Sequence, residues 1–130
     1  MLMCLIVKNK WHKNGKPLIA KEDIVVFKLL SKFKNQVFTP FRFHPVNFRN
    51  GECQMKSTLR REKSKYGYIC KHGIHAFLDK PYKMILTSRN FVVKAIIPKG
   101  AYYFIGNKYD IVANKMIITN EICLKGPTQL

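Results

Sequence analysis

The sequence has 130 residues, the usual size of one compact domain, and its 47% hydrophobic content excludes an intrinsically disordered chain. With 24 Lys and Arg against seven Asp and Glu, the formal net charge is +17 at pH 7. A surplus of this size predicts an anionic partner: a nucleic acid, a nucleotide or an acidic protein surface. We therefore expect residues 1–130 to form a single basic domain.

The basic residues are mainly lysines, 19 against five arginines. Lysine attracts anions as a point charge, whereas arginine supplies the planar fork that reads guanine or grips phosphate in two places. General anion attraction is thus favoured over base-specific reading. A second interpretation stays open, in which the lysines reflect an AT-rich genome and serve only as solvated surface.

The four cysteines show no CxxC pair, which favours reduced thiols in a cytoplasm. The apolar start, Met1–Val7, lacks a basic leader and is too short for a secretion signal or a membrane span. We read it as a first strand and expect no membrane association.

Strands are predicted wherever β-branched and aromatic residues lie between turn signals. A wide loop or hairpin follows the first strand at Lys8–Pro17, and Ser31–Gln36 is predicted to be a turn. The basic run Arg60–Lys65 reads as a solvated loop, although a phosphate site is the alternative. The predicted strands after the first are Ile24–Leu30, Val37–Thr39, Glu52–Leu59, Tyr66–Cys70, Ile74–Phe77, Phe91–Ile97, Ala101–Ile105 and Lys115–Cys123.

One helix is predicted over Asp79–Arg89, with Asp79 as its N-cap, Pro81 in the first turn and Arg89 near the end. Together with roughly seven or eight short strands, this helix predicts an α+β domain built on a mainly antiparallel, strongly bent sheet.

The densest group of chemically active side chains is Cys70, His72 and His75. As a zinc site it is incomplete, because no paired spacing supplies a fourth ligand. In an extended strand Cys70 and His72 share one face, while Gly73 allows a bend before His75. We assign no metal and no cofactor.

An enzyme centred on His75 with Cys70 or Cys4 as nucleophile is an alternative, but the spacing selects no pair. Only seven carboxylates are present, with no obvious working pair for acid–base catalysis. The GxGxxG, GxxxxGK[ST] and HExxH motifs are all absent. Whether the protein is an enzyme is left uncertain, and a binding protein is favoured.

Several segments spread along the chain resemble a group of small uncharacterised proteins of gut bacteria and their phages. This resemblance implies a phage or mobile-element protein in the cytoplasm of a bacterial host cell, where use against host defence is one role, and it implies no mechanism. The matching segments are Met3–Val7, Ala20–Ile24, Thr39–Pro40, Gly73–Phe77, Ile97–Tyr103 and Asp110–Val112.

Two enzymatic alternatives follow from resemblance. Met1 and Leu2 precede the start typical of that group, so initiation at Met3 would expose Cys4 as an N-terminal nucleophile. Val92–Gly100 is also similar to a strand and turn of ADP-ribosyltransferase-like folds, for which Thr87–Ser88 and Glu121 are the only loose counterparts of the family's site residues.

We therefore expect a non-catalytic binder of an anionic ligand, either nucleic acid or nucleotide. The alternatives are a Cys/His-dependent or ADP-ribosyltransferase-like enzyme, and a virion or protein-interaction component. The expected ligand-binding residues supply attraction, hydrogen bonds and stacking. They are Arg60, Arg61, Lys63, Lys65, His75, Lys99, Tyr102 and Tyr103.

Overall fold

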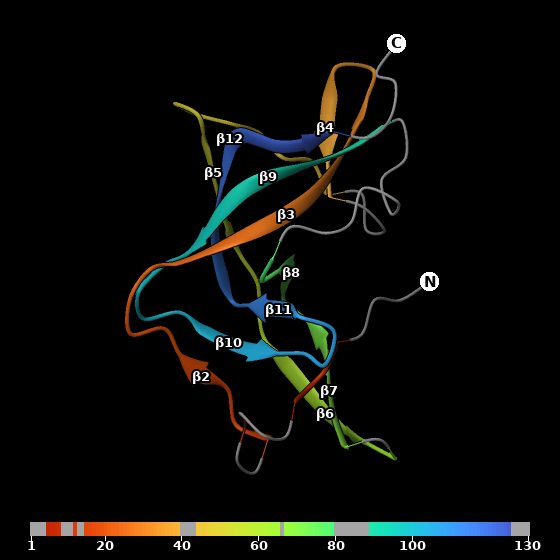
Figure 1. Cartoon of the computed structure of the whole chain (residues 1–130), viewed down its shortest axis with the longest axis vertical. Helices are drawn as coiled ribbons and strands as arrows, with labels where there is room; N and C mark the ends of the chain where they lie inside the picture. The colour runs from red at the N-terminus through yellow and green to blue at the C-terminus, as the bar shows by residue number, and fades with distance from the viewer. Residues whose placement is uncertain are drawn as a thin grey trace.

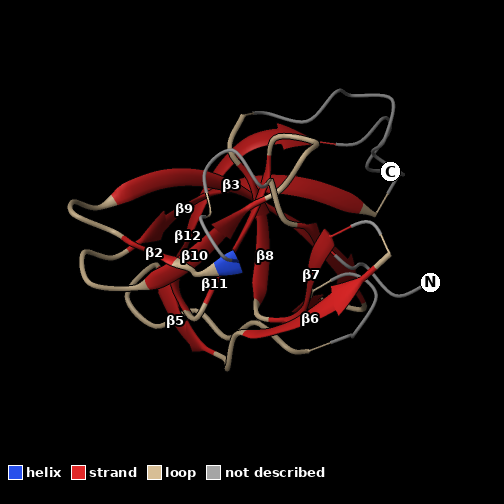
Figure 2. Cartoon of the chain, turned by 90° about the horizontal axis from the view of Figure 1, so that it is seen from below, coloured by secondary structure: helices blue, strands red, loops and turns tan. Residues whose placement is uncertain are grey.

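The fold, in a computed structural model, is nearly all β (Figure 2), and it describes residues 5–8, 12, 15–39, 44–65, 67–79 and 89–125. Strands and bridges account for 67% of these residues and a helical turn for 1%. The predicted α+β class is therefore wrong, since none of the described ranges contains a helix. The predicted helix lies mostly outside the described residues, at 80–88.

Twelve strands are described. They are β1 (Leu5–Ile6), β2 (Leu18–Ile19), β3 (Ile24–Phe33), β4 (Gln36–Phe38), β5 (Glu52–Lys56), β6 (Arg60–Ser64), β7 (Gly67–His72), β8 (Ile74–Phe77), β9 (Asn90–Ile97), β10 (Tyr102–Ile105), β11 (Asp110–Ala113) and β12 (Lys115–Lys125).

The strands form two sheets. A nine-stranded sheet has the order β2-β10-β11-β8-β3-β9-β12-β5, with β4 paired to β3, and a three-stranded sheet has the order β1-β7-β6. In Figure 1 the long strands β3, β9 and β12 make up the upper part of the molecule, and β2, β10 and β11 lie below them. Every pairing of named strands is antiparallel, which confirms the predicted antiparallel arrangement.

The large sheet is held together by the alternation of its central strands. In β3 the side chains of Val26 and Leu30 are fully buried on one face, and in β9 Val93 and Ala95 are equally buried. Strands with this period of two bury one face while the other remains accessible. The strands β3, β9 and β12 pair along much of their lengths. Their buried side chains belong to one cluster, so the large sheet supplies its own core.

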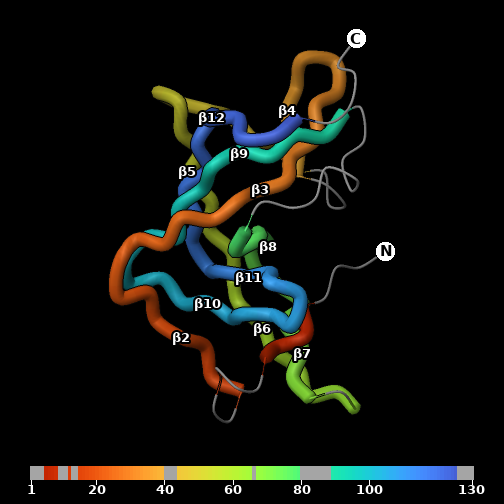
Figure 3. Tube along the Cα trace, in the orientation of Figure 1, coloured from red at the N-terminus to blue at the C-terminus, as the bar shows by residue number. Residues whose placement is uncertain are grey.

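The segment β7–Gly73–β8 joins the two sheets, because β7 belongs to the small sheet and β8 to the large one. Figure 3 shows the chain passing directly from β7 into β8. A second, smaller cluster packs at this junction, with Leu5 and Cys70 from the small sheet against Phe104 and Val112 from the large one. The junction thus fixes how the two sheets sit relative to one another.

Two of the predicted boundaries are wrong. Ser31–Gln36 was expected to turn, but β3 continues to Phe33 and the turn is confined to Lys34 and Asn35, whose φ angles are 49° and 65°. The basic run expected as a loop forms β6, since it pairs along β7 from Arg60 to Ser64. Pairing with a hydrophobic neighbour therefore overrides the low strand propensity of these charged residues.

His12 is a buried histidine with a structural task. Its ring is only 2% exposed, the Ile105 N–H donates to its Nε2 at 2.8 Å, and its Nδ1 lies 2.9 Å from the Lys16 carbonyl. Because Nε2 accepts a hydrogen bond, Nδ1 carries the proton and donates to Lys16. Burial lowers the pKa of His12, although the hydrogen bond to Lys16 acts in the opposite direction.

We expect His12→Ala to lower the free energy of unfolding by about 1 to 3 kcal/mol, because the Ile105 N–H and the Lys16 carbonyl lose their partner. The pKa is 6.5 in the unfolded chain and lower in the folded protein, so stability falls as the pH drops below 6.5. Urea titrations at several pH values would show this acid sensitivity in the parent and not in the variant. His44→Ala, at an exposed position, is the control and should keep the acid sensitivity of the parent.

Candidate functional site

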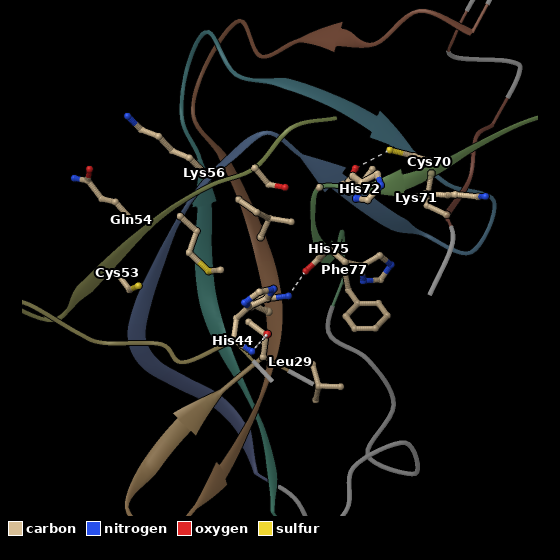
Figure 4. A pocket seen from close by; sticks show the side chains of 18 of the residues that line it. Leu29, His44, Cys53, Gln54, Lys56, Cys70, Lys71, His72, His75 and Phe77 are labelled. Atoms are coloured by element: carbon tan, nitrogen blue, oxygen red, sulfur yellow. Dashed lines mark hydrogen bonds between the residues drawn. The ribbon is translucent and has the colours of Figure 1, made fainter. Parts of the chain in front are cut away.

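A pocket of about 460 Å³ lies among the edge strand β5, the β7–β8 segment and β3. Figure 4 shows Cys53, Gln54 and Lys56 along one side of it, and Cys70, Lys71 and His72 on the other. Apolar side chains complete the walls, among them Leu5, Ile74, Phe77 and Val112. A volume of this size, with apolar walls and a few polar groups, is typical of small-molecule sites.

The residues that line this pocket are rich in basic side chains. Among the described residues that line it there are three lysines and three histidines but no aspartate or glutamate. The six come from four strands and the chain before β5, with Lys71 and His72 adjacent on β7, so the basic character is created by the fold. They are Lys28, Lys56, Lys71, His44, His72 and His75.

Lys28 is the most unusual of them. It lies on the core-facing side of β3, between Val26 and Leu30, and is only 6% exposed. Its Nζ donates to the His75 carbonyl at 2.5 Å. This bond bridges β3 and β8, which share a single register pair, Phe27 with Phe77.

Burial lowers the pKa of Lys28 to about 8. No carboxylate within the described ranges forms an ion pair with the Lys28 amine, so the hydrogen bond to the His75 carbonyl is not supported by an opposite charge there. A buried amine of this kind loses its proton far more readily than a surface lysine.

His75 is held in place by Asp110 of the neighbouring strand β11. Nε2 of His75 lies 3.3 Å from Oδ2 of Asp110, and both side chains are mostly buried. Burial opposes ionisation of Asp110, but the hydrogen bond and charge of His75, with backbone N–H groups, outweigh it and lower the pKa of that carboxyl. Phe77 packs edge-on against the imidazole at 5.5 Å, so the orientation of His75 is fixed.

Lys71 forms an ion pair with a carboxylate on the neighbouring strand. Its Nζ lies 2.8 Å from Oε2 of Glu62 on β6, and both side chains are about two-fifths exposed. The hydrogen bond and charge of Lys71 lower the pKa of Glu62. Lys71 therefore adds to the basic wall while Glu62 limits how much it adds.

The thiol–imidazole cluster seen in the sequence does not converge into one centre. Cys70 Sγ donates to the backbone carbonyl of His72 at 3.0 Å, a contact with no imidazole in it. Both histidines line the pocket with Cys70. In the described part of the chain no group of three or more His, Cys, Asp and Glu could hold a metal ion.

The structure places the predicted site residues in three separate regions, and only His75 lines the pocket. Arg60, Arg61 and Lys63 lie on β6, and Lys65 lies in the turn that follows. The Arg61 guanidinium stacks over the Tyr68 ring at 4.9 Å.

The remaining predicted residues lie around the turn between β9 and β10, away from β6 (Figures 1 and 2). The Lys99 N–H donates to Asp23, Tyr102 is exposed on β10, and Tyr103 packs against the larger cluster. Residues 87–88, which were counterparts of ADP-ribosyltransferase site residues, lie outside the described residues. Residue 4, the candidate N-terminal nucleophile, also lies outside them. Glu121 is on β12, where its carboxylate lies 3.9 Å from Lys94.

Comparison of the chain with protein-family models, curated proteins and solved structures gives no match. The resemblance to small phage and gut-bacterial proteins therefore stays a prediction. In the described ranges no helix is long and apolar enough to cross a membrane.

Sequence reasoning missed Lys28, Lys56 and His44. For Lys28 the signal was present, because a period of two places it on the same face as Val26 and Leu30, which are fully buried. For Lys56 and His44 no local pattern distinguishes them from other surface residues, since their role arises only when β5 and the chain before it come to lie beside β3.

Proposed function

We propose that this protein binds a small phosphate-bearing ligand of nucleotide size in the pocket between β5, β3 and the β7–β8 segment. One observation carries the proposal: three lysines and three histidines, and no aspartate or glutamate, are among the described residues that line the pocket. Positive groups gathered in a concave site raise the local concentration of anions and orient them.

The pocket also fits the rest of a nucleotide. Its volume of about 460 Å³ falls in the range of small-ligand sites, and the partly exposed Leu29 and Phe77 offer apolar surface for a base or sugar. Lys28 and His75 present hydrogen-bonding groups that are already held in place, which limits the entropy lost on binding.

Nucleic acid is the less favoured ligand. A single strand requires a basic groove with exposed aromatic rings along it. The basic residues of β6 belong to the small sheet and Tyr102 to the large one, and Tyr68, which lies opposite Lys63 in the register, is covered by Arg61. The positive field would still attract a polynucleotide weakly at low salt.

The test is calorimetric titration with a nucleoside 5′-monophosphate and with the same nucleoside lacking the phosphate. We expect binding of the phosphate form alone, and Lys56→Gln should weaken it about tenfold, as the loss of a charge-assisted contact does. Lys115→Gln is the matched control, because Lys115 pairs with Lys56 across β12 and β5 but does not line the pocket.

Equal losses in the two variants would mean that the net charge, and not the pocket, attracts the anion. A short single-stranded oligonucleotide completes the experiment. Binding of the oligonucleotide that is abolished by a double Arg60→Gln, Lys63→Gln change, with no binding of the monophosphate, would overturn the proposal in favour of β6.

A further inference from the structure

The Lys28 amine has no oppositely charged partner among the described residues. A charged lysine in a protein interior is normally paired with a carboxylate, because an isolated buried charge is costly. Here the His75 carbonyl is the acceptor, and none of the described carboxylates reaches the Lys28 amine. A leucine or methionine would fill the same core-facing position at a lower cost in stability.

The amine is nevertheless open to the chemistry of the pocket, since Lys28 is one of its lining residues. Uncharged lysine amines attack carbonyl carbon and form imines, and enzymes obtain such amines by removing the lysine from water. Phosphate-bearing aldehydes combine the two features that this pocket would recognise, an anion for its basic wall and a carbonyl for its amine.

We propose that Nζ of Lys28 forms an imine with an aldehyde-bearing phosphorylated ligand held in the pocket. This rests on the proposed function, because the basic side chains must first bind the phosphate. It adds a covalent step at one named atom, which turns a binding site into one that captures or activates a carbonyl compound.

The step balances without any further reactant. The neutral amine attacks the carbonyl carbon, a C–N bond forms, and the carbonyl oxygen takes up a proton to give a carbinolamine. The C–O bond then breaks, the oxygen leaves as water with the two protons that the nitrogen has lost, and a C=N bond remains. An imidazole of the pocket can carry these protons, and His75 is already oriented by Asp110.

Burial prepares the amine for this reaction. With a pKa of about 8 in place of 10.5, the neutral fraction of Lys28 near pH 7 is about 300-fold larger than that of an ordinary lysine. The titratable groups that face it across the pocket are basic or thiol groups from β5, β7, β8 and the chain before β5. They are Lys56, Lys71, His44, His72, His75, Cys53 and Cys70.

Pyridoxal 5′-phosphate with cyanoborohydride tests the proposal, because the reductant fixes an imine as a stable secondary amine that peptide mass mapping locates. We expect Lys28 to be labelled at least tenfold faster than any other lysine, with the rate rising as the pH approaches 8. Excess nucleoside 5′-monophosphate should protect it, and pyridoxal without the phosphate should label it at least tenfold more slowly.

Lys28→Met removes the reactive amine at a site that accepts an apolar side chain, and Lys94→Met is the control on the neighbouring strand β9. The fast phase of labelling should be lost in the first variant alone. Labelling spread over surface lysines, with Lys28 unmodified, overturns the imine. If the parent still binds the monophosphate in that case, the proposed function stands, whereas a parent that binds neither probe overturns both.

Discussion

Replacing Lys28 by methionine is expected to stabilise the folded protein by about 2 kcal/mol at pH 7 while weakening anion binding in the pocket at least tenfold. A pKa lowered from 10.5 to about 8 corresponds to about 3 kcal/mol of unfavourable desolvation, and loss of the hydrogen bond to His75 returns about 1 kcal/mol. Methionine is long and flexible enough to fill the space on the core face of β3.

The gain in stability depends on pH in a defined window. Below pH 8 the folded parent carries the full cost of the buried charge, since Lys28 is protonated in both states. Between pH 8 and 10.5 the folded state loses this proton while the unfolded chain keeps it, so the parent becomes more stable as the pH rises. The advantage of the variant should therefore shrink across this window, reach zero about 1.5 pH units above 8, and reverse by about 1 kcal/mol near pH 10.5, where only the hydrogen bond to His75 distinguishes the two proteins.

Guanidinium unfolding curves of parent and variant, recorded from pH 7 to 10.5, measure this difference in the free energy of unfolding. The contributions of all other titratable groups are shared by the two proteins and cancel. Lys94→Met is the control, because Lys94 lies opposite Phe27 in the register but has a partly exposed side chain. It should change the free energy of unfolding by no more than about 0.5 kcal/mol, without pH dependence. A Lys28→Met protein less stable than the parent at pH 7 would contradict the desolvated amine.

Gly73→Ala is expected to lower the free energy of unfolding by about 2 to 4 kcal/mol, the combined cost of overpacking and of an unfavourable backbone angle. Gly73 has φ of +137°, and an added Cβ would meet the Val112 side chain and lie 2.7 Å from Leu59 Cδ2. Val112 is buried in the smaller cluster and cannot move away without disturbing it.

Gly100→Ala is the matched control for this change. Gly100 also has a positive φ, +89°, but nothing lies within 4 Å of an added Cβ. Its cost should be limited to backbone strain, about 1 kcal/mol. Thermal unfolding of both variants separates the two contributions, and equal losses would show that Gly73 is needed for its backbone angle alone.

The strands of this fold were largely predictable, because β3, β9 and β12 carry the branched and aromatic residues that favour a sheet. The predictions that failed relied on local composition in segments where pairing with a strand distant in sequence decides the structure. Arg60–Ser64 looks like a loop by composition, yet its backbone hydrogen-bonds along β7. Asp110–Ala113 was not predicted as a strand, although Ile111, Val112 and Ala113 are all buried there between β10 and β8.

The candidate site was less predictable for a physical reason. Its basic residues are dispersed from Lys28 to His75, and no motif links them, since the sheet order β3-β9-β12-β5 and the β7–β8 connection bring them together. The sequence singled out His75, which lines the pocket, but it placed the positive charge on the run at Arg60–Lys65. The most densely charged segment of the chain therefore lies outside the pocket.

The division of the pocket between two sheets has a kinetic consequence. Cys70, Lys71 and His72 belong to the small sheet, which meets the large one through a cluster of five buried residues and a few backbone hydrogen bonds, among them Asn107 N–H to the Ile6 carbonyl. Small units of this kind open locally without global unfolding. We expect a ligand that touches both walls to hold them together, and its residence time to depend on the rate at which β1, β7 and β6 open.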